Sequence, residues 1–500
     1  MLEAGDHLDP DIDGEHVAQR LRRTLRRATR RQEIQRHCYA WNEVNPDVFV
    51  DDVDNPYVAA DGKPYYWFRC RGVGGRTLAS NGVALRLSDW ELKAGHRDGL
   101  SEEWPLSYAE LSPFYARVER FLGVHGSTER LSQLPDGMFI APRELRTGEL
   151  VFQERLHARY ADRRVIPCRY FARTSSFPGG CSVSSTLAAA LKTGRVTLQT
   201  NSVTSHVLVD PHTGRATGVA YVDTQTGTWR EIHARVVALC ASTLESTRIL
   251  LNSTSNRHPG GLGNSSGVLG KFLMDKIGTT ALAIVPGVYS DAGTQNAYDS
   301  FLIPNFTNLE RSSGKFGRGY GLMGGMQPLQ PSRMMKLLER MRLLRIADES
   351  NVFFWLQAYG ETLPRAENFV ELDPQRKDRW GIPILRISCA WSQNELAMFA
   401  DMQQSMREMF EAVGGTIESE RETPTTPGAK IHEVGTARMG IDPRTSVLNR
   451  FNQCWDAPNV FVLDGACWVS SGWQPTSLTI MALAVRGAEH IVSELKRMSL

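Results

Sequence analysis

Residues 235–251 constrain the fold most strongly, because a β-branched strand runs directly into a helix there. The run RVVAL at residues 235–239 predicts a buried strand, and Cys240-Ala241-Ser242 then leads into a helix through residues 249–251. Parallel strands need such a crossover, since a tight hairpin joins only antiparallel neighbours. The segment therefore predicts an α/β chain with a parallel sheet, and the mixture of short strands and longer helices indicates interleaved domains.

Other segments show the periodicity of single strands or helices. A helix is expected over residues 394–413, and its proposed buried stripe consists of Leu396, Phe399, Met402, Met406, Met409 and Phe410. A second helix, over residues 478–495, has Thr476 or Ser477 as its expected N-cap. Strands are expected at residues 196–200, 203–209, 216–222, 228–232 and 460–463, with strand-like alternation over residues 368–387.

The composition is that of an ordinary soluble protein, with 41% apolar residues, 22% charged residues and a net charge of +2. The run from Arg20 to Arg36 holds eight arginines. Apolar residues at helical spacing within it (Val17, Leu21, Leu25 and Ala28) favour an amphipathic helix with a solvated arginine face over a nucleic-acid or membrane patch. No nucleic-acid partner is predicted.

Neither a membrane span nor a metal site is predicted. No stretch reaches the roughly 18 consecutive apolar residues of a span, and no signal peptide opens the chain, so a cytoplasmic location is expected. Eight cysteines are scattered without a CxxC pair, which argues against zinc ribbons and against a disulfide-rich secreted fold.

The first residues, MLEAG, are typical of the end of the second strand in a dinucleotide-binding unit. In that setting Glu3 would accept hydrogen bonds from the adenosine ribose. No G-x-G-x-x-G precedes it, and the glycines at residues 72–75 and 261–267 do not have the required strand and helix around them. We therefore expect the first strand and glycine loop to be missing from this chain, and the natural gene to extend upstream by roughly thirty residues.

Four further motifs follow in order: RGVGGRTLASN from Arg71, ASTLESTRILL from Ala241, HEVGTARMG from His432 and the DGA step at Asp464. Together with LEAG, they resemble the glucose-methanol-choline (GMC) oxidoreductases over nearly the whole chain. The segments from Gly261 and Ser446 are most similar to a bacterial branch that acts on sugars and glycosides.

This resemblance implies a Rossmann-like FAD-binding domain interleaved with a substrate-binding sheet domain. The FAD-binding domain would comprise residues 1–130, 190–275 and 430–500, and the substrate-binding domain residues 131–189 and 276–429. The implied reaction oxidises a hydroxyl of a sugar, aminosugar or glycoside by hydride transfer to flavin N5. The electron acceptor stays open.

The resemblance also implies site residues. His432 is the candidate base for the hydroxyl proton, since a neutral imidazole suits that task. The expected FAD contacts are Glu3, Gly74, Gly75, Asn81, Val203, Ala241, Asp464, Gly465 and Ser477. Of these, Ser477 opens a helix whose positive end can stabilise a reduced flavin.

The chain departs from the family at two positions. Lys276 stands where the sugar-active branch has a histidine, and we expect it in a lid over the substrate. The family's Asn-Pro pair falls on Pro475-Thr476, so Gln474 is predicted to replace the Asn as the partner of His432, with Thr476 as the alternative. These departures leave open a catalytically silent binding protein, or a truncated form that cannot hold FAD. A nicotinamide dehydrogenase is disfavoured because it has no role for the His432 and Asp464 motifs.

Overall fold

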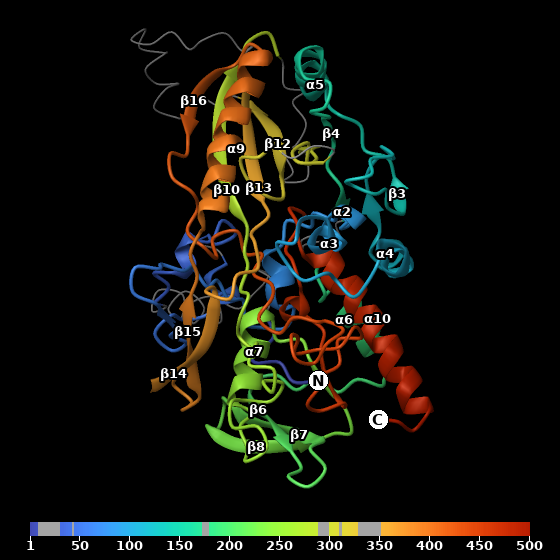
Figure 1. Ribbon diagram of the computed structural model, residues 1–500, viewed down its shortest axis with the longest axis vertical. Coiled ribbons are helices and arrows are strands. Elements are labelled where there is room, and N and C mark those ends of the chain that lie inside the picture. Colours follow the sequence, from blue (N-terminus) through green and yellow to red (C-terminus); the bar gives the residue numbers. More distant parts are fainter. Residues whose placement is uncertain (9–30, 43–44, 173–179, 289–299, 310–312, 329–351) are drawn as a thin grey trace, which may run out of the picture.

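The computed structural model describes residues 1–8, 31–42, 45–172, 180–288, 300–309, 313–328 and 352–500. The amphipathic helix expected around Val17 to Ala28 lies outside these residues. The rest forms a mixed α/β fold, as expected (Figure 1).

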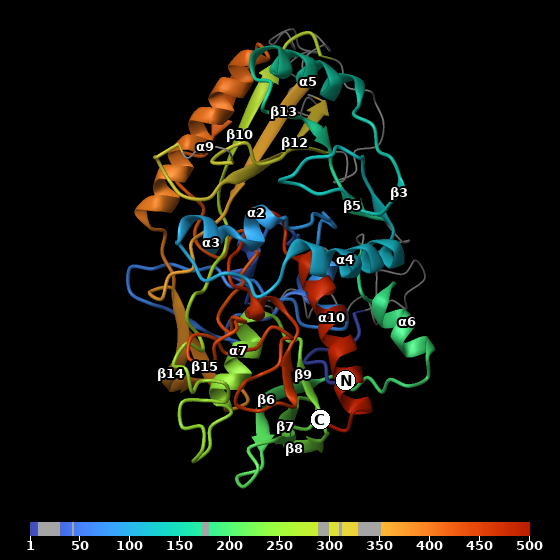
Figure 2. The same ribbon diagram turned by 45° about the vertical axis from the view of Figure 1, so that its right-hand side comes forward.

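A six-stranded sheet occupies one end of the molecule, in the order β16-β10-β13-β12-β11-β4 with antiparallel neighbours. Helix α9 (Gln393–Ala412) lies along this sheet (Figures 1 and 2). Helix α5 (Thr147–Arg159) adds Phe152, which stacks on Phe354 of the sheet. The strands are β4 (Ile166–Pro167), β10 (Ile277–Val285), β11 (Phe301–Ile303), β12 (Tyr320–Pro328), β13 (Val352–Gly360) and β16 (Thr416–Glu420).

The predicted strand-to-helix unit lies at the other end. Strand β9 (Val237–Leu239) pairs in parallel with β17 (Val460–Val462) and continues into helix α7 (Thr243–Asn252). Beside it, β6 (Ser202–Val209), β7 (Ala216–Asp223) and β8 (Thr228–His233) form an antiparallel meander. The expected strand at residues 196–200 is wrong. It contributes only a bridge from Gln199 to Leu2, because Asn201 turns the chain with a φ of 56°.

The alternating segment 368–387 is a hairpin of β14 (Phe369–Lys377) and β15 (Pro383–Ser388), with β1 (Val58–Ala59) beside β15. The shorter elements are η1 (Gln35–His37), η2 (Pro46–Val48), η3 (Gly75–Ala79), α2 (Asp89–Leu92), α3 (Ala94–Asp98), β2 (Val124–His125), β3 (Phe139–Ala141), β5 (Tyr170–Phe171), α6 (Thr186–Lys192) and η4 (Gly465–Cys467).

The stripe expected on α9 is correct except at Leu396. The other five residues are at most 6% exposed, whereas Leu396 is 38% exposed. At 100° per residue, Leu396 lies on the edge of the arc that the buried side chains define, and Met398 falls inside it. The buried face of α9 therefore keeps five of the six expected residues and includes Met398 in place of Leu396.

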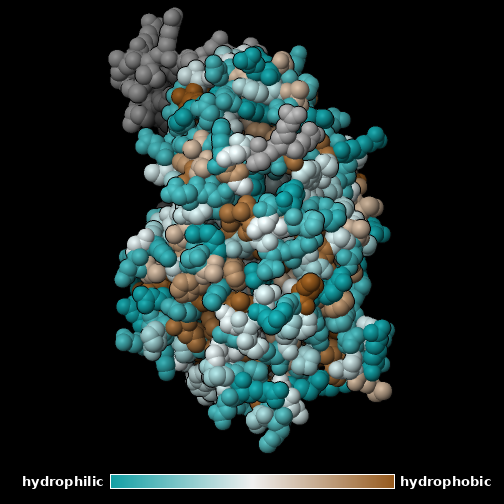
Figure 3. All heavy atoms as spheres, viewed as in Figure 1, coloured by the Kyte–Doolittle hydropathy of each residue, from teal (hydrophilic) through white to brown (hydrophobic). Residues whose placement is uncertain are grey.

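Helix α10 (Ser477–Lys496) packs against α4 (Tyr108–Leu122), and Thr476 is its N-cap residue. The Thr476 side chain makes no capping hydrogen bond, so its hydroxyl does not close the first turn. None of the described helices is long and apolar enough to cross a membrane. The face in Figure 3 is mainly hydrophilic, with apolar side chains scattered over it.

Candidate active site

The motif that begins at His432 runs alongside the motif that begins at Asp464. Gly435 donates its N–H to the Gly465 carbonyl at 3.0 Å, and Ala437 and Met439 donate theirs to Ala466 and Cys467, each at 2.9 Å. A Cβ on Gly465 would lie 2.5 Å from Thr243 Oγ1, so only glycine permits this approach. Two segments that are distant from helix α7 in the sequence therefore pack against its first turn.

Asp464 connects these segments through its buried carboxylate. The carboxylate accepts hydrogen bonds from the Ser246 hydroxyl of α7 and from the Ala466 N–H, the latter at 3.0 Å. The Ser246 hydroxyl also accepts the N–H of Ala241 at 3.1 Å. Burial raises the pKa of Asp464 to about 6, although these hydrogen bonds oppose the shift.

The N-terminal segment and the glycine turn lie together in the same way. A Cβ on Gly5 would come within 2.5 Å of the Gly72 nitrogen, and Val73 donates its N–H to the Asp6 carbonyl at 2.9 Å. Glu3 accepts the Gly5 N–H at 2.9 Å, and burial raises the pKa of its carboxyl. Beyond the turn, Arg76 forms an ion pair with Glu433, the residue after His432.

His432 lies at the centre of this junction. Its backbone N–H donates to Asp275 at 3.0 Å, and its ring meets the Tyr359 ring edge to face at 6.0 Å. Its Nδ1 atom is buried and has no hydrogen-bond partner among the described residues. Burial, together with the charges of Lys276, Lys430 and Arg76, holds the pKa of His432 well below its ordinary value. The imidazole is therefore neutral near pH 7 and free to accept a proton.

Lys276 does not lie in a lid. The residue directly precedes β10, is fully buried, and donates to the Gly472 carbonyl at 2.5 Å. Burial lowers its pKa to about 8, against the attraction of Glu361, Asp275 and Glu91. The lid was expected from the position that Lys276 holds in the family, which carries no information on the buried carbonyls that its side chain contacts.

Gln474 is fully buried, and neither polar atom of its amide has a hydrogen-bond partner among the described residues. The amide lies beside Gly472 and Glu91. No direct hydrogen bond to His432 is present among the described contacts, and Pro475 and Thr476 continue toward α10. The amide faces the buried Glu91 carboxylate closely enough to lower the pKa of that group, which burial raises.

The remaining predicted residues are spread around the junction. Gly74 has a φ of 108°, and Gly75, with a φ of 50°, has open space where a Cβ would stand. Asn81 and Ala241 are exposed, whereas Val203 is buried against Ala4 and Trp380, and Ser477 is half-buried at the start of α10. Their roles toward a cofactor stay predictions.

Asp275, Lys430 and Tyr359 lie at the site but were not expected there. Asp275 accepts the N–H groups of Gly428, Lys430 and His432, and the Lys430 ammonium lies 4.6 Å from the centre of the Tyr359 ring. Asp275 could have been found from its position, because it is an acidic residue beside Lys276 and just before a long apolar strand. Nothing in the sequence alone points to Lys430 or Tyr359.

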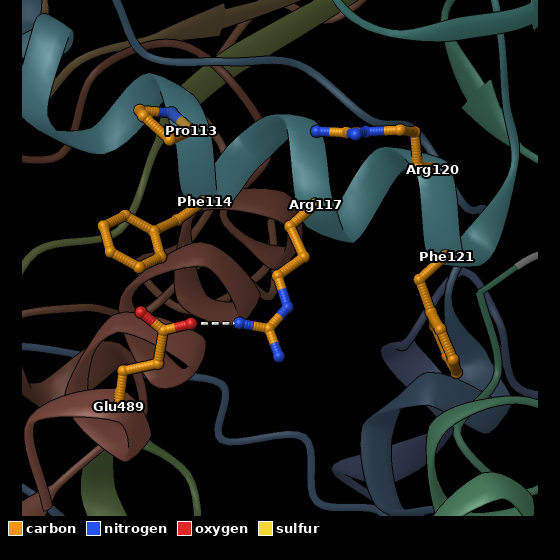
Figure 4. A pocket seen from close by; sticks show the side chains of 6 residues that line it. All are labelled: Pro113, Phe114, Arg117, Arg120, Phe121 and Glu489. Carbon is orange, nitrogen blue, oxygen red and sulfur yellow. Dashed lines mark hydrogen bonds and ion pairs between the residues drawn. The ribbon is translucent and has the colours of Figure 1, made fainter. Parts of the chain in front are cut away.

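A separate pocket lies on the outer side of α4 and α10, away from His432 (Figure 4). Phe114, Arg117, Phe121 and Glu489 line it, and Arg117 forms an ion pair with Glu489 across it. One half-buried ring (Phe114), one exposed ring (Phe121) and a surface ion pair supply no nucleophile, base or unpaired buried group. This pocket therefore adds nothing to the candidate chemistry.

The junction thus combines a buried histidine whose Nδ1 has no partner among the described residues with a buried carboxylate just after β17. The GMC oxidoreductase profiles match residues 54–277 with the N-terminal part of the family and residues 364–484 with the C-terminal part. The chain belongs to the GMC oxidoreductase family, whose members bind FAD.

Known proteins resemble the chain over most of its length. A 2-methyl-1,2-propanediol dehydrogenase of Mycolicibacterium austroafricanum is 31% identical over 457 residues, which cover 84% of this chain and 80% of the relative. A C-glycoside 3-oxidase of Microbacterium trichothecenolyticum is 26% identical, with coverage of 87% and 78%. The formate oxidase of Aspergillus oryzae RIB40 shares the fold, with a TM-score of 0.63, 13% identity and coverage of 99% and 94%.

The residues present fit a flavin nucleotide. Helix α10 has an N-terminus without a side-chain cap, which leaves its backbone N–H groups and positive partial charge available. Open space at Gly75 and the unpaired polar atoms of His432 and Gln474 provide room and hydrogen-bonding capacity for a bound group.

Proposed function

We propose that this protein oxidises a hydroxyl of a sugar, aminosugar or glycoside to a carbonyl, with His432 as the base. The observation that carries the proposal is the buried Nδ1 of a neutral imidazole without a partner, at the junction of all five motifs. FAD supplies the hydride acceptor at its N5. Residues 1–130, 190–275 and 430–500 would bind FAD, and residues 131–189 and 276–429 would bind the substrate.

The charges around His432 have two effects on the proposed proton transfer: they lower the basicity of the imidazole, and they would stabilise negative charge on the substrate oxygen. When a substrate hydroxyl gives its proton to His432, negative charge develops on the substrate oxygen. Lys276, Lys430 and Arg76 lie near enough to His432 that their positive charges lower its pKa. The same cations would stabilise the oxygen, and they are in place before the reaction begins. The amide of Gln474, or the hydroxyl of Thr476, would orient the substrate beside the base.

Around the cofactor, Glu3 would bind the adenosine ribose, with Val203 and Ala241 beside the adenosine. Asp464 and Gly465 would hold the ribityl and pyrophosphate part. Gly74, Gly75 and Asn81 would approach the flavin ring from the glycine turn, and the helix that begins at Ser477 would stabilise its negative charge. Backbone contacts at glycines suit this task because no Cβ stands in the way.

The test is anaerobic bleaching of the flavin absorbance in protein loaded with FAD. Glucose, glucosamine and methyl glucoside should reduce the flavin faster than methanol or choline. His432→Ala protein, loaded in the same way, is the control for reduction that does not use the site. Bleaching by small alcohols but by no sugar in a broad panel would reject the proposed substrate class.

A small vicinal diol is the second candidate substrate, and the 31% identity to 2-methyl-1,2-propanediol dehydrogenase favours it. Both candidates use the same base and cofactor, so only the substrate pocket distinguishes them. Including 2-methyl-1,2-propanediol in the same panel decides between them by the ratio of reduction rates at equal concentration.

A further inference from the structure

The dipeptide Asp275-Lys276 touches both loops that carry the proposed reaction centre. The Asp275 carboxylate accepts three backbone N–H groups of the loop that contains His432: Gly428 at 2.8 Å, Lys430 at 3.3 Å and His432 at 3.0 Å. The Lys276 ammonium donates to the Gly472 carbonyl at 2.5 Å and lies 3.5 Å from the Ser471 carbonyl. Two adjacent side chains thus hold the backbones of two different loops.

The second loop reaches the Gln474 amide through Gly472. Gly472 has a φ of 63°, and a Cβ there would lie 2.8 Å from Gln474 Oε1. Glycine is required here for two reasons: it can adopt this positive φ, and it leaves room for the amide to lie this close. Lys276 holds the Gly472 carbonyl, and the Gly472 backbone lies against the Gln474 amide. A shift of the Lys276 ammonium would therefore also shift the amide.

Burying a lysine costs desolvation free energy, and two hydrogen bonds to carbonyls alone do not explain why the chain has one here. Lys276 is fully buried, while the neighbouring carboxylates Glu361, Asp275 and Glu91 offset its charge. Glu361 is also paired with Arg318 at 3.0 Å, so it does not depend on Lys276 alone. Among the described residues, Lys276 is the donor to both loop carbonyls, while Thr362 donates its N–H to the Ser471 hydroxyl at 3.2 Å.

We propose that Asp275 and Lys276 are positioning residues that set the two loops relative to each other, Asp275 for the loop of His432 and Lys276 for the loop of Gln474. This inference rests on the proposed function of those two residues. Lys276 has a second effect through its charge, which favours the neutral form of His432. The two effects of Lys276 can be separated by comparison with Lys430. Lys430 also lowers the pKa of His432 through its charge, but it does not bond the Gly472 carbonyl.

The charged groups near His432 come from three parts of the fold. They are Asp275 and Lys276 just before β10, Lys430 and Glu433 in its own loop, and Arg76 in the glycine turn, and the three cations among them lower its pKa. Removing either lysine charge should raise the pKa of His432. The rate of flavin reduction rises with pH as His432 loses its proton, so this rise should move to higher pH in both Lys276→Met and Lys430→Met.

The experiment compares these two variants by amide hydrogen exchange of residues 471–476, which needs no turnover, and by flavin reduction. Lys276→Met should speed exchange in this loop at least about tenfold, since it removes buried hydrogen bonds. It should also lower the limiting reduction rate by up to about a hundredfold through misplacement of the amide. Lys430→Met should leave the exchange of this loop within about threefold, because Lys430 makes no bond to the Gly472 carbonyl, while loss of its charge should also slow reduction. Lys63→Met, which removes a lysine bound to Ser388 far along β15, is the matched control.

Parent-like exchange in Lys276→Met, or equal opening in Lys430→Met, would overturn the proposal. If Lys276→Met does not fold, Lys276→Gln gives the same test, because its shorter amide does not span the distance to the Gly472 carbonyl. Parent-like exchange in that variant also overturns it. Faster exchange in Lys276→Met, together with a parent flavin that no substrate reduces, would uphold the positioning role and reject the proposed function instead.

Discussion

The core beneath α9 and the junction around His432 are both buried, yet they are built in opposite ways. Beneath α9, methionine and phenylalanine side chains pack against the apolar face of β10 and β13. At the junction, Asp275, Lys276 and Asp464 are buried charged groups, and His432 and Gln474 keep unpaired polar atoms. The backbone is also strained there, with positive φ at Ser242 (83°), Thr436 (75°) and Ile431 (60°).

This difference separates the part that stabilises the fold from the part that does chemistry. Burial of apolar side chains contributes free energy of folding, whereas unpaired polar atoms and left-handed non-glycine residues cost it. Proteins keep such destabilising groups mainly at functional sites, where the groups contact a ligand. Substitutions in the two regions should therefore affect different measurements.

The largest expected effect is on the reaction, from His432→Ala. Loss of the base should lower the rate of flavin reduction by about 10²–10⁴-fold, with little change in thermal unfolding. Stopped-flow reduction in FAD-loaded protein measures the first quantity, and calorimetry the second. A variant that reduces flavin normally would remove His432 from the mechanism.

Gln474→Ala should lower the reduction rate by about 10²–10³-fold, the usual loss for one positioned donor. Thr476→Ala should cost little helix stability, since the Thr476 side chain makes no capping bond, and the hydroxyl thereby stays the alternative donor. The same stopped-flow measurement on both variants decides which side chain assists the base. Collapse in Thr476→Ala with normal reduction in Gln474→Ala would transfer the role to Thr476.

Met402→Ala tests the other region. Met402 is fully buried under β10, so truncation should lower the free energy of unfolding by about 2–5 kcal/mol. The reduction rate of the folded variant should match the parent. Denaturant unfolding measures the loss, and a slower reaction in fully folded protein would mean that the two regions are coupled.

The sequence predicted the elements whose pattern is local. The run before Cys240 gave a strand and helix as expected, and the helix over residues 394–413 is α9. The motifs touch one another in pairs, Gly5 on Gly72, Arg76 on Glu433 and Gly465 on Thr243. By contrast, Lys276 was misplaced because its partners Glu361 and Glu91 lie far away in sequence, and the same is true of the Asp275 contact to His432. Buried polar networks depend on such distant pairs, which periodicity does not reveal.

The smallest expected effect concerns Leu396, where the predicted stripe was wrong. Leu396 is 38% exposed, whereas Met398, two residues further along the same helix, is fully buried. Leu396→Gln should change the free energy of unfolding by no more than about 0.5 kcal/mol, as for other surface substitutions. Met398→Gln places an amide in the methionine core, where an unpaired polar group costs about 1–3 kcal/mol in addition to the lost packing. Urea unfolding of the two variants measures the difference. Equal losses would mean that the edge of the α9 stripe is as well packed as its centre, because only contact with the core makes a glutamine costly at either position.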